Sequence, residues 1–177
     1  MTLDLSAIRQ PETDVARQYA PEAFEGRAGQ FRVVSPVDLR FKVYKDRERY
    51  RLAGRVTTTL ELGCSRCLEP FRQPVDAPFD IRYLPQSANA GTDEREIEED
   101  DLSDAFYRDE QIDLLQLMEE QFYLSLPMKP LCREDCKGLC PNCGTNWNVA
   151  SCDCQVRWED PRLAGLKALM NRDNDNA

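Results

Sequence analysis

The sequence predicts an α+β protein in which a small antiparallel β-sheet, able to close toward a barrel, is packed by one central helix. Two patterns predict this core: apolar and polar residues alternate through much of 36–83, and a broadly apolar stretch with helix-capping residues follows at 113–126. A third, the six cysteines between residues 132 and 154, adds a cysteine-rich C-terminal module. The 177 residues suffice for one domain or one domain with a small appendage.

Four regions follow from these patterns. Residues 1–85 form an N-terminal region with a basic antiparallel sheet, and residues 86–110 form an acidic, flexible connector. Residues 111–131 contain the central helix, which packs on the sheet. Residues 132–177 hold the cysteine-rich module and a C-terminal helix.

A long hairpin is the clearest part of the predicted sheet. Its first strand has apolar residues at every second position, namely Val37, Leu39, Phe41 and Val43. After a charged turn at 45–48, the second strand buries one face from Tyr50 to Leu62, with a bulge or bend expected at Ala53-Gly54. A third strand at 75–83 is expected to be an edge or to end quickly, since prolines lie at 74, 78 and 85.

The other elements have local signals. Leu3 and Leu5 predict a short strand, and residues 11–19 predict a helix that starts with a proline. Asp113, with Gln116 three residues later, predicts the N-terminus of the central helix. Asp160 followed by Pro161 predicts the start of the last helix.

Composition excludes several classes of enzyme. The chain has no histidine, so it lacks a Ser-His-Asp triad, a Cys-His nucleophile pair and a histidine-ligated catalytic zinc. The commonest general base near neutral pH is also missing. We therefore expect a protein that is not an enzyme and takes no small-molecule substrate.

Eight cysteines need an explanation. Residues 1–5 show neither the basic start nor the apolar run of a signal peptide, and no stretch reaches the roughly 18 apolar residues of a membrane span. We therefore expect a cytoplasmic protein with no membrane partner. In a reducing compartment, thiols at these spacings are more often metal ligands than disulfides.

The cysteine spacing predicts structural zinc, as one or two ions. The segment 140–144, Cys-Pro-Asn-Cys-Gly, is typical of a zinc knuckle, and Gly144 can adopt the positive φ that closes such a turn. One site would use Cys140, Cys143, Cys152 and Cys154. The remaining pairs would form a second site from Cys64, Cys67, Cys132 and Cys136. A competing partition places Cys132 or Cys136 in the C-terminal site and leaves Cys64 and Cys67 without metal.

Other thiol chemistry remains open. Cys64 and Cys67 could form a redox pair, although such motifs usually open a helix and this pair follows a strand. An iron–sulfur cluster could use the same sulfurs. A thiol-dependent enzyme would require a cysteine of low pKa.

Charge is unevenly distributed although the net charge is −9. Residues 27–72 hold eleven basic and five acidic residues, whereas residues 93–120 hold thirteen acidic residues and two arginines. The predicted strands place cations on one sheet face, where they could follow phosphates while Tyr44 stacks on a base. The candidate RNA-binding residues are Arg40, Lys42, Arg49, Arg51 and Arg55, with Arg66 and Arg72 beyond them. The acidic block at 93–104 is expected to be a solvated loop, with mimicry of nucleic acid as the alternative.

Five segments of the chain resemble the motifs of one known protein family. Residues 64–71, Cys-Ser-Arg-Cys-Leu-Glu-Pro-Phe, resemble the family's C-x-R-C-L-x-P-F box. Residues 112–115 and 124–132 resemble its central helix and the exit from that helix. Residues 136–144 and 160–164 match its C-terminal boxes. The family that the chain resembles is the YceD family of bacteria and plastids, and the resemblance covers most of residues 60–170.

The resemblance implies a role in the synthesis, processing or stability of large-subunit ribosomal RNA. The expected partner is ribosomal RNA or a large-subunit precursor, and a ribosomal protein is a further candidate. An alternative is a zinc-stabilised adaptor that docks on protein without touching RNA. The resemblance supplies no catalytic residue.

Overall fold

The computed structural model describes residues 1–26, 29–86 and 104–154. These described residues divide into two compact units: the first lies within 1–65 and 69–132, and the second comprises 66–68 and 133–154. Residues 93–103 of the loop predicted at 93–104 lie outside the described residues, and so does the predicted helix from Asp160.

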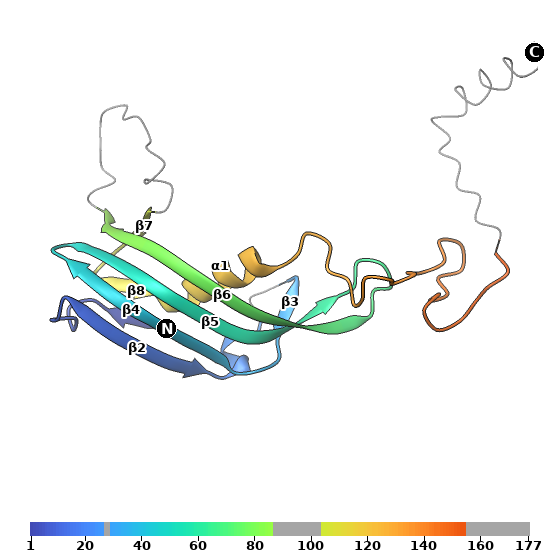
Figure 1. Ribbon diagram of the computed structural model, residues 1–177, viewed down its shortest axis with the longest axis horizontal. Helices are drawn as coiled ribbons and strands as arrows, with labels where there is room; N and C mark the ends of the chain where they lie inside the picture. Colours follow the sequence, from blue (N-terminus) through green and yellow to red (C-terminus); the bar gives the residue numbers. More distant parts are fainter. Residues whose placement is uncertain (27–28, 87–103, 155–177) are drawn as a thin grey trace, which may run out of the picture. The chain divides into compact units, whose positions relative to one another are not determined.

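The first unit contains a six-stranded sheet in the order β2-β4-β5-β6-β7, with β3 also paired to β5 (Figure 1). Its strands are β2 (Glu12–Tyr19), β3 (Phe31–Val33), β4 (Val37–Asp46), β5 (Arg49–Gly63), β6 (Pro70–Pro85) and β7 (Asp104–Tyr107). A separate antiparallel pair joins β1 (Thr2–Asp4) to β8 (Gln111–Asp113). Among the described strands the sheet stays open, since β2 and β7 are its two ends.

The predicted hairpin is confirmed. β4 and β5 pair from Asp38↔Thr57 to Asp46↔Arg49, and the turn places Arg47 at a φ of 55°. Along β5 every second side chain is buried, including Tyr50, Leu52, Val56, Leu60 and Leu62. The period-two pattern therefore identified both the strands and their inner face.

The bulge expected at Ala53-Gly54 is wrong. Gly54 pairs with Phe41 on one side and with Phe79 on the other, and the register continues unbroken through both ladders. A Cβ atom at Gly54 would lie 2.3 Å from the carbonyl oxygen of Arg40 and 2.3 Å from the Cβ of Phe41. The glycine is thus explained by close strand approach and not by an inserted residue.

The helix predicted at 11–19 is wrong, because these residues form β2. The strand pairs antiparallel with β4 along its whole length, from Glu12↔Tyr44 to Tyr19↔Val37. Its side chains alternate between exposed and half-buried, the period of a strand. The pairing partner lies more than 15 residues away along the chain, so local signals such as a leading proline misidentify this segment.

The short strand expected near Leu3 is confirmed as β1, which pairs with β8 through Leu3↔Ile112. The third predicted strand is β6. Over 70–81 it pairs with β5 alone among the described strands, and over Arg82–Pro85 it also pairs in parallel with β7. The segment 86–110 is predicted to be a flexible connector. Because β7 and the residues up to Arg108 lie within it, part of this segment is ordered sheet instead.

The central helix is α1 (Leu114–Ser125), and it begins as predicted. Asp113 caps it, because its carboxylate Oδ1 accepts hydrogen bonds from the backbone N–H of Leu115 at 2.9 Å and of Gln116 at 3.4 Å. The capping box is incomplete, since the Gln116 side chain donates to Glu120 instead.

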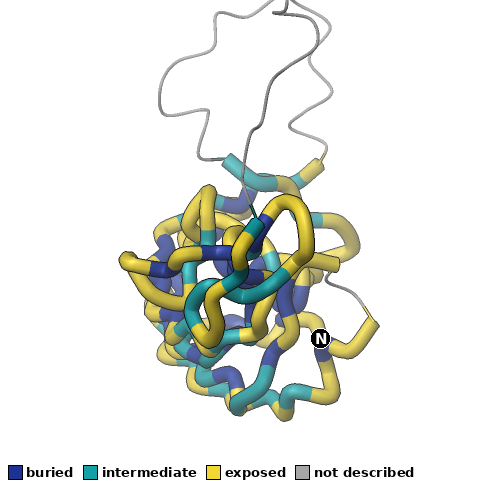
Figure 2. The backbone as a smooth tube through the Cα atoms, turned by 90° about the vertical axis from the view of Figure 1, so that its right-hand side faces the viewer, coloured by how far each residue is buried: buried dark blue, intermediate teal, exposed yellow. Residues whose placement is uncertain are grey.

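The apolar side of α1 packs into the core of the first unit, as predicted. Phe122 is fully buried, and its ring centroid lies 5.7 Å from that of Phe24 and 5.9 Å from that of Phe31. Phe24 belongs to the short helix η1 (Pro21–Phe24). Buried residues of the strands and of α1 belong to one apolar core, which holds the sheet and the helix together. Figure 2 shows buried segments (dark blue) among exposed ones (yellow) along the backbone.

Candidate metal centres and the charged sheet face

The structure gathers the eight cysteines into two groups. Within each group, the four sulfur atoms all lie within 4.8 Å of one another. The first group contains Cys64, Cys67, Cys132 and Cys136, and the second contains Cys140, Cys143, Cys152 and Cys154. This grouping matches the two-site partition from spacing, and it differs from the competing partition, because Cys132 and Cys136 lie with Cys64 and Cys67.

A tight turn presents the sulfurs of the second group. The backbone N–H of Gly144 donates to the carbonyl of Cys140 at 2.9 Å, and the N–H of Cys140 donates to the carbonyl of Thr145 at 2.8 Å. Gly144 has a φ of 73°, as its place in the predicted knuckle required. Leu139 and Asn146 then form an antiparallel bridge, which closes the turn.

The pKa values of two cysteines in the second group are shifted in opposite directions. The hydroxyl and backbone of Thr145 lower the pKa of Cys143 to about 6, and the Cys143 sulfur lies 3.1 Å from the Thr145 hydroxyl. Hydrogen bonding to Cys143 raises the pKa of Cys154 to about 12. The thiolate is the form of cysteine that binds a metal ion, so metal binding at this group would release the proton that Cys154 holds.

The first group begins in the turn after β5. The backbone N–H of Cys64 donates to the carbonyl of Glu69 at 2.9 Å, and Leu68 in this turn has a φ of 62°. The N–H of Ser65 donates to the carbonyl of Pro130 at 2.8 Å. Cys64, Cys67 and Cys136 are buried, whereas Cys132 is exposed.

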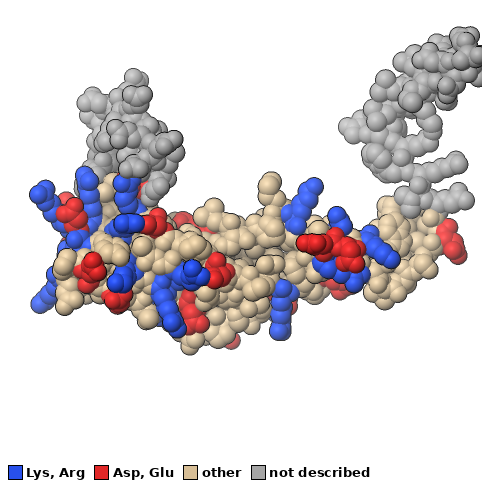
Figure 3. Space-filling model, in the orientation of Figure 1, with Lys and Arg blue, Asp and Glu red and all other residues tan. Residues whose placement is uncertain are grey.

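The candidate RNA-binding residues of the hairpin share one exposed face of the sheet. Arg40 lies directly opposite Arg55 in the β4–β5 register, and the side chains of Arg40, Lys42, Arg49, Arg51 and Arg55 are all solvent-accessible. Figure 3 shows lysine and arginine side chains over the sheet together with acidic ones. The face is therefore mixed in charge.

Three of the five cations are paired with carboxylates from neighbouring strands. Arg51 Nε donates to Asp80 Oδ1 at 2.7 Å, and Arg55 Nη1 donates to Asp76 Oδ2 at 2.6 Å. Lys42 Nζ lies 3.9 Å from carboxylates of both Glu12 and Asp14. The hydrogen bond from Arg51 lowers the pKa of Asp80.

The five predicted residues do share one face of the sheet, but three of them are ion-paired, and RNA binding by this face stays a prediction. The pairing acids belong to β2, a segment expected to be a helix, and to β6, the third predicted strand, whose register with the hairpin was not predicted. Arg40 and Arg49 have no carboxylate partner in the part of the chain that the structure describes.

Arg66 and Arg72 lie elsewhere. Arg66 Nη1 donates to the carbonyls of Cys136 at 2.8 Å and Glu134 at 3.4 Å, so this side chain supports the cysteine-bearing backbone. Arg72 of β6 is exposed and lies opposite Glu61 in the β5–β6 register.

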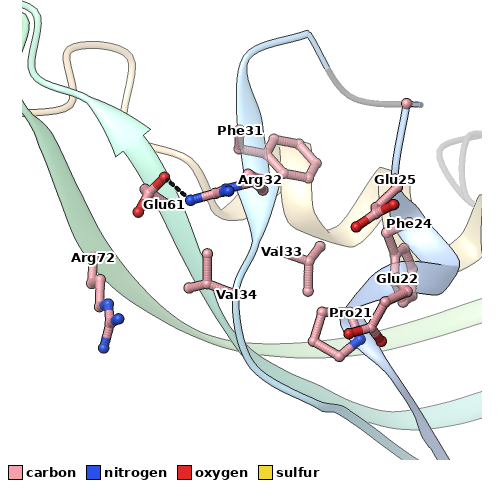
Figure 4. A pocket seen from close by; sticks show the side chains of 11 residues that line it. Pro21, Glu22, Phe24, Glu25, Phe31, Arg32, Val33, Val34, Glu61 and Arg72 are labelled. Carbon is pink, nitrogen blue, oxygen red and sulfur yellow. Dashed lines mark hydrogen bonds and ion pairs between the residues drawn. The ribbon is translucent and has the colours of Figure 1, made fainter.

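Arg72 also lines a hollow of about 570 Å³ between η1 and β3 (Figure 4). The hollow is floored by Phe24, Phe31 and Val33, and its Arg32 is paired with Glu61 at 2.6 Å. Its lining contains no cysteine, serine, threonine or tyrosine. The polar side chains of its lining are carboxylates and guanidinium groups, with no thiol or hydroxyl group among them.

Among the described residues, no helix is long and apolar enough to cross a membrane. An open antiparallel sheet under one helix, followed by cysteine-bearing turns, defines a small β-rich protein whose candidate sites are thiol groups suited to metal. The model of the family described as large ribosomal RNA subunit accumulation protein YceD matches residues 52–170. The chain belongs to the YceD family.

Relatives in plastids and bacteria agree with this assignment. The chain is 30% identical over 158 residues to the chloroplastic large ribosomal RNA subunit accumulation protein YCED homolog 1 of Zea mays, an alignment covering 76% of this chain and 53% of that protein. It is 37% identical over 142 residues to an uncharacterized protein of Mycobacterium tuberculosis, covering 78% and 64%. The uncharacterized protein YlbN of Bacillus subtilis is 27% identical over 146 residues, covering 82% and 80%.

The chain thus spans about half of the maize relative and somewhat under two thirds of the mycobacterial one. No solved structure matches it. The YceD family is named for ribosomal RNA accumulation and not for a catalysed reaction.

Proposed function

We propose that this protein is a non-enzymatic ribosome-biogenesis factor that supports accumulation of large-subunit ribosomal RNA, with two structural zinc centres. The observation that supports the role in ribosomal RNA accumulation is that the chain belongs to a family named for it. The two groups of four cysteines support the proposed zinc centres. The cytoplasmic location, expected because residues 1–5 lack the features of a signal peptide, is part of the same proposal.

Zinc fits both groups in ligand type and spacing. Four thiolates at about 2.3 Å from one tetrahedral ion lie about 3.8 Å apart, and sulfurs within 4.8 Å of one another can reach that distance by small side-chain rotations. A cluster of several iron atoms needs thiolates spread around more than one metal, so these close sets favour a single ion. A four-cysteine site has no open coordination position and would hold structure without catalysing a reaction.

Direct RNA contact would use the outer face of β4 and β5. Arg40 and Arg49 are the first candidates, because their guanidinium groups have no carboxylate partner within the described residues. Arg51 and Arg55 would contribute by exchanging Asp80 and Asp76 for phosphate. Such exposed ion pairs contribute little stability, so their exchange costs little.

The alternative is a zinc-stabilised adaptor that docks on a ribosomal protein. The ion pairs on the sheet face favour this second candidate, since three of five candidate cations are already partly neutralised. Pull-down from cells before and after nuclease treatment separates the two candidates. Recovery of large-subunit RNA that nuclease abolishes supports direct RNA contact, whereas nuclease-resistant recovery of one ribosomal protein supports the adaptor.

A charge-matched pair of variants sharpens this test. R40Q/R49Q removes the two cations without carboxylate partners, and R9Q/K129Q removes the same charge outside the hairpin. If the face binds RNA, the first variant lowers the slope of log affinity against log salt by about two and the control leaves it unchanged. Equal slopes in both variants would contradict RNA binding by this face.

A further inference from the structure

Three consecutive residues, Asn146, Trp147 and Asn148, contact both cysteine groups. They follow the knuckle turn of the second unit, and backbone hydrogen bonds join them to the short segment that precedes this turn. Asn146 bridges to Leu139, and the backbone N–H of Trp147 donates to the carbonyl of Gly138 at 3.0 Å. We call residues 146–148 the linking turn.

Asn148 faces the first cysteine group. Its side-chain Nδ2 donates to the sulfur of Cys136 at 3.3 Å and to Asn146 Oδ1 at 2.9 Å. Its Oδ1 accepts from the backbone N–H of Lys137 at 2.9 Å and from Arg133 at 2.7 Å. Because those two partners can only donate, the amide is oriented with its N–H groups toward the sulfur.

Trp147 faces the second cysteine group. Its indole Nε1 donates to the sulfur of Cys152 at 3.3 Å. Indole is a donor only, so the sulfur is the acceptor in this contact. Neighbouring residues of one turn thus supply an N–H donor to each group.

We propose that the linking turn couples metal binding at the two groups, which rests on the proposed function that both hold zinc. A metal ion bound at either group would fix the positions of its four sulfurs, and with them the position of the N–H donor that faces one of those sulfurs. The turn has little freedom to move one donor without the other, since Asn146 and the N–H of Trp147 tie it to residues 138–139. Trp147 and Asn148 are positioning residues that act through the ligands.

The test is a metal titration of full-length chains in which one group has lost two thiols. Zn²⁺ is titrated in competition with a chromophoric chelator, first into C143S/C154S and then into C64S/C67S. Coupling predicts that the intact group in each variant binds Zn²⁺ with an affinity at least about tenfold lower than the same group has in the wild-type protein. Because coupling is reciprocal, the two factors should be equal.

Two single variants assign the effect to the linking turn. N148D keeps the acceptor for Lys137 and Arg133 but replaces the donor that faces Cys136. In the N148D background, C143S/C154S should change the Zn²⁺ affinity of the first group by less than about threefold. The reason is that N148D has already removed the hydrogen bond from the linking turn to Cys136. V149T is the control, since Val149 is 85% exposed and should keep the full wild-type factor.

Each outcome decides a separate question. Wild-type protein that binds no zinc overturns the proposed centres, whereas two ions that bind with affinities insensitive to loss of the other group overturn only the coupling. If a double cysteine variant does not fold, W147F replaces it, because W147F keeps all eight thiols and removes only the donor to Cys152. Coupling then predicts weaker zinc binding at both groups, and weakening confined to one group contradicts it.

Discussion

The strands on both sides of Gly54, in the middle of the longest hairpin, determine which amino acid this position can hold. The residues paired with it on both sides are phenylalanines, Phe41 and Phe79, whose ring centroids are 6.1 Å apart. There is no room for a Cβ atom, which would lie 2.3 Å from backbone oxygen. From sequence, a glycine within a strand pattern indicates either a bulge or close approach, and only the neighbouring strands decide between them.

We predict that Gly54→Ala destabilises the protein by about 1–3 kcal/mol, because the backbone of β4 must move away from the new methyl group. Urea unfolding followed by circular dichroism measures this change. Gly63→Ala is the matched control, since no atom lies within 4 Å of a Cβ built there, and it should stay within about 0.5 kcal/mol of wild type. Equal stabilities for the two variants would contradict the close approach at Gly54.

The ion pairs of the sheet face give a second prediction for single residues. D76N/D80N frees Arg55 and Arg51, so an RNA-binding face should bind RNA several-fold more tightly at low salt and with a steeper salt dependence. Filter binding over a salt series measures both quantities. E22Q/E25Q removes the same charge from η1 and its C-cap and should have a much smaller effect, whereas identical curves for the two variants would favour the adaptor.

Among the elements, α1 and the β4–β5 hairpin could be predicted because their signals are local. Asp113 marks the helix start, and alternation of apolar residues marks the inner face of each strand. β2 could not be predicted in this way, since a strand at the sheet end takes its conformation from pairing with β4. The same limit applies to β7, whose four residues pair with the far end of β6.

The helix cap provides a prediction at this scale. Asp113→Ala should cost about 1 kcal/mol, because the first turn of α1 loses the acceptor for two backbone N–H groups. Asp113→Asn should retain most of the stability, as asparagine caps equally well. Thermal unfolding of both variants tests the assignment, and a similar loss in both would show that the carboxylate acts in some way other than capping.

For the whole molecule, the cysteines could be sorted from sequence more completely than the charges. Eight thiols divide into two sets of four, and the pair spacings leave few partitions, one of which the structure shows. The charged face depends on which acids the fold brings beside the hairpin. Glu12, Asp76 and Asp80 are distant in sequence from the cations they meet, so a count along the chain overestimated the positive charge.

Metal removal should affect the second unit most, because turns and a single isolated bridge are its regular structure among the described residues. A chelator in reducing buffer is predicted to lower Tm and to change the fluorescence of Trp147, which donates to the sulfur of Cys152. Adding back Zn²⁺ should restore both. Fluorescence that is unchanged by chelator and by added metal would contradict a metal at the second group.

The most direct measurement for the account is the metal content of freshly isolated, reduced protein, determined by elemental analysis against protein concentration. Two groups of four cysteines predict about two zinc ions per chain. Protein that folds cooperatively and contains no bound metal would contradict the central claim.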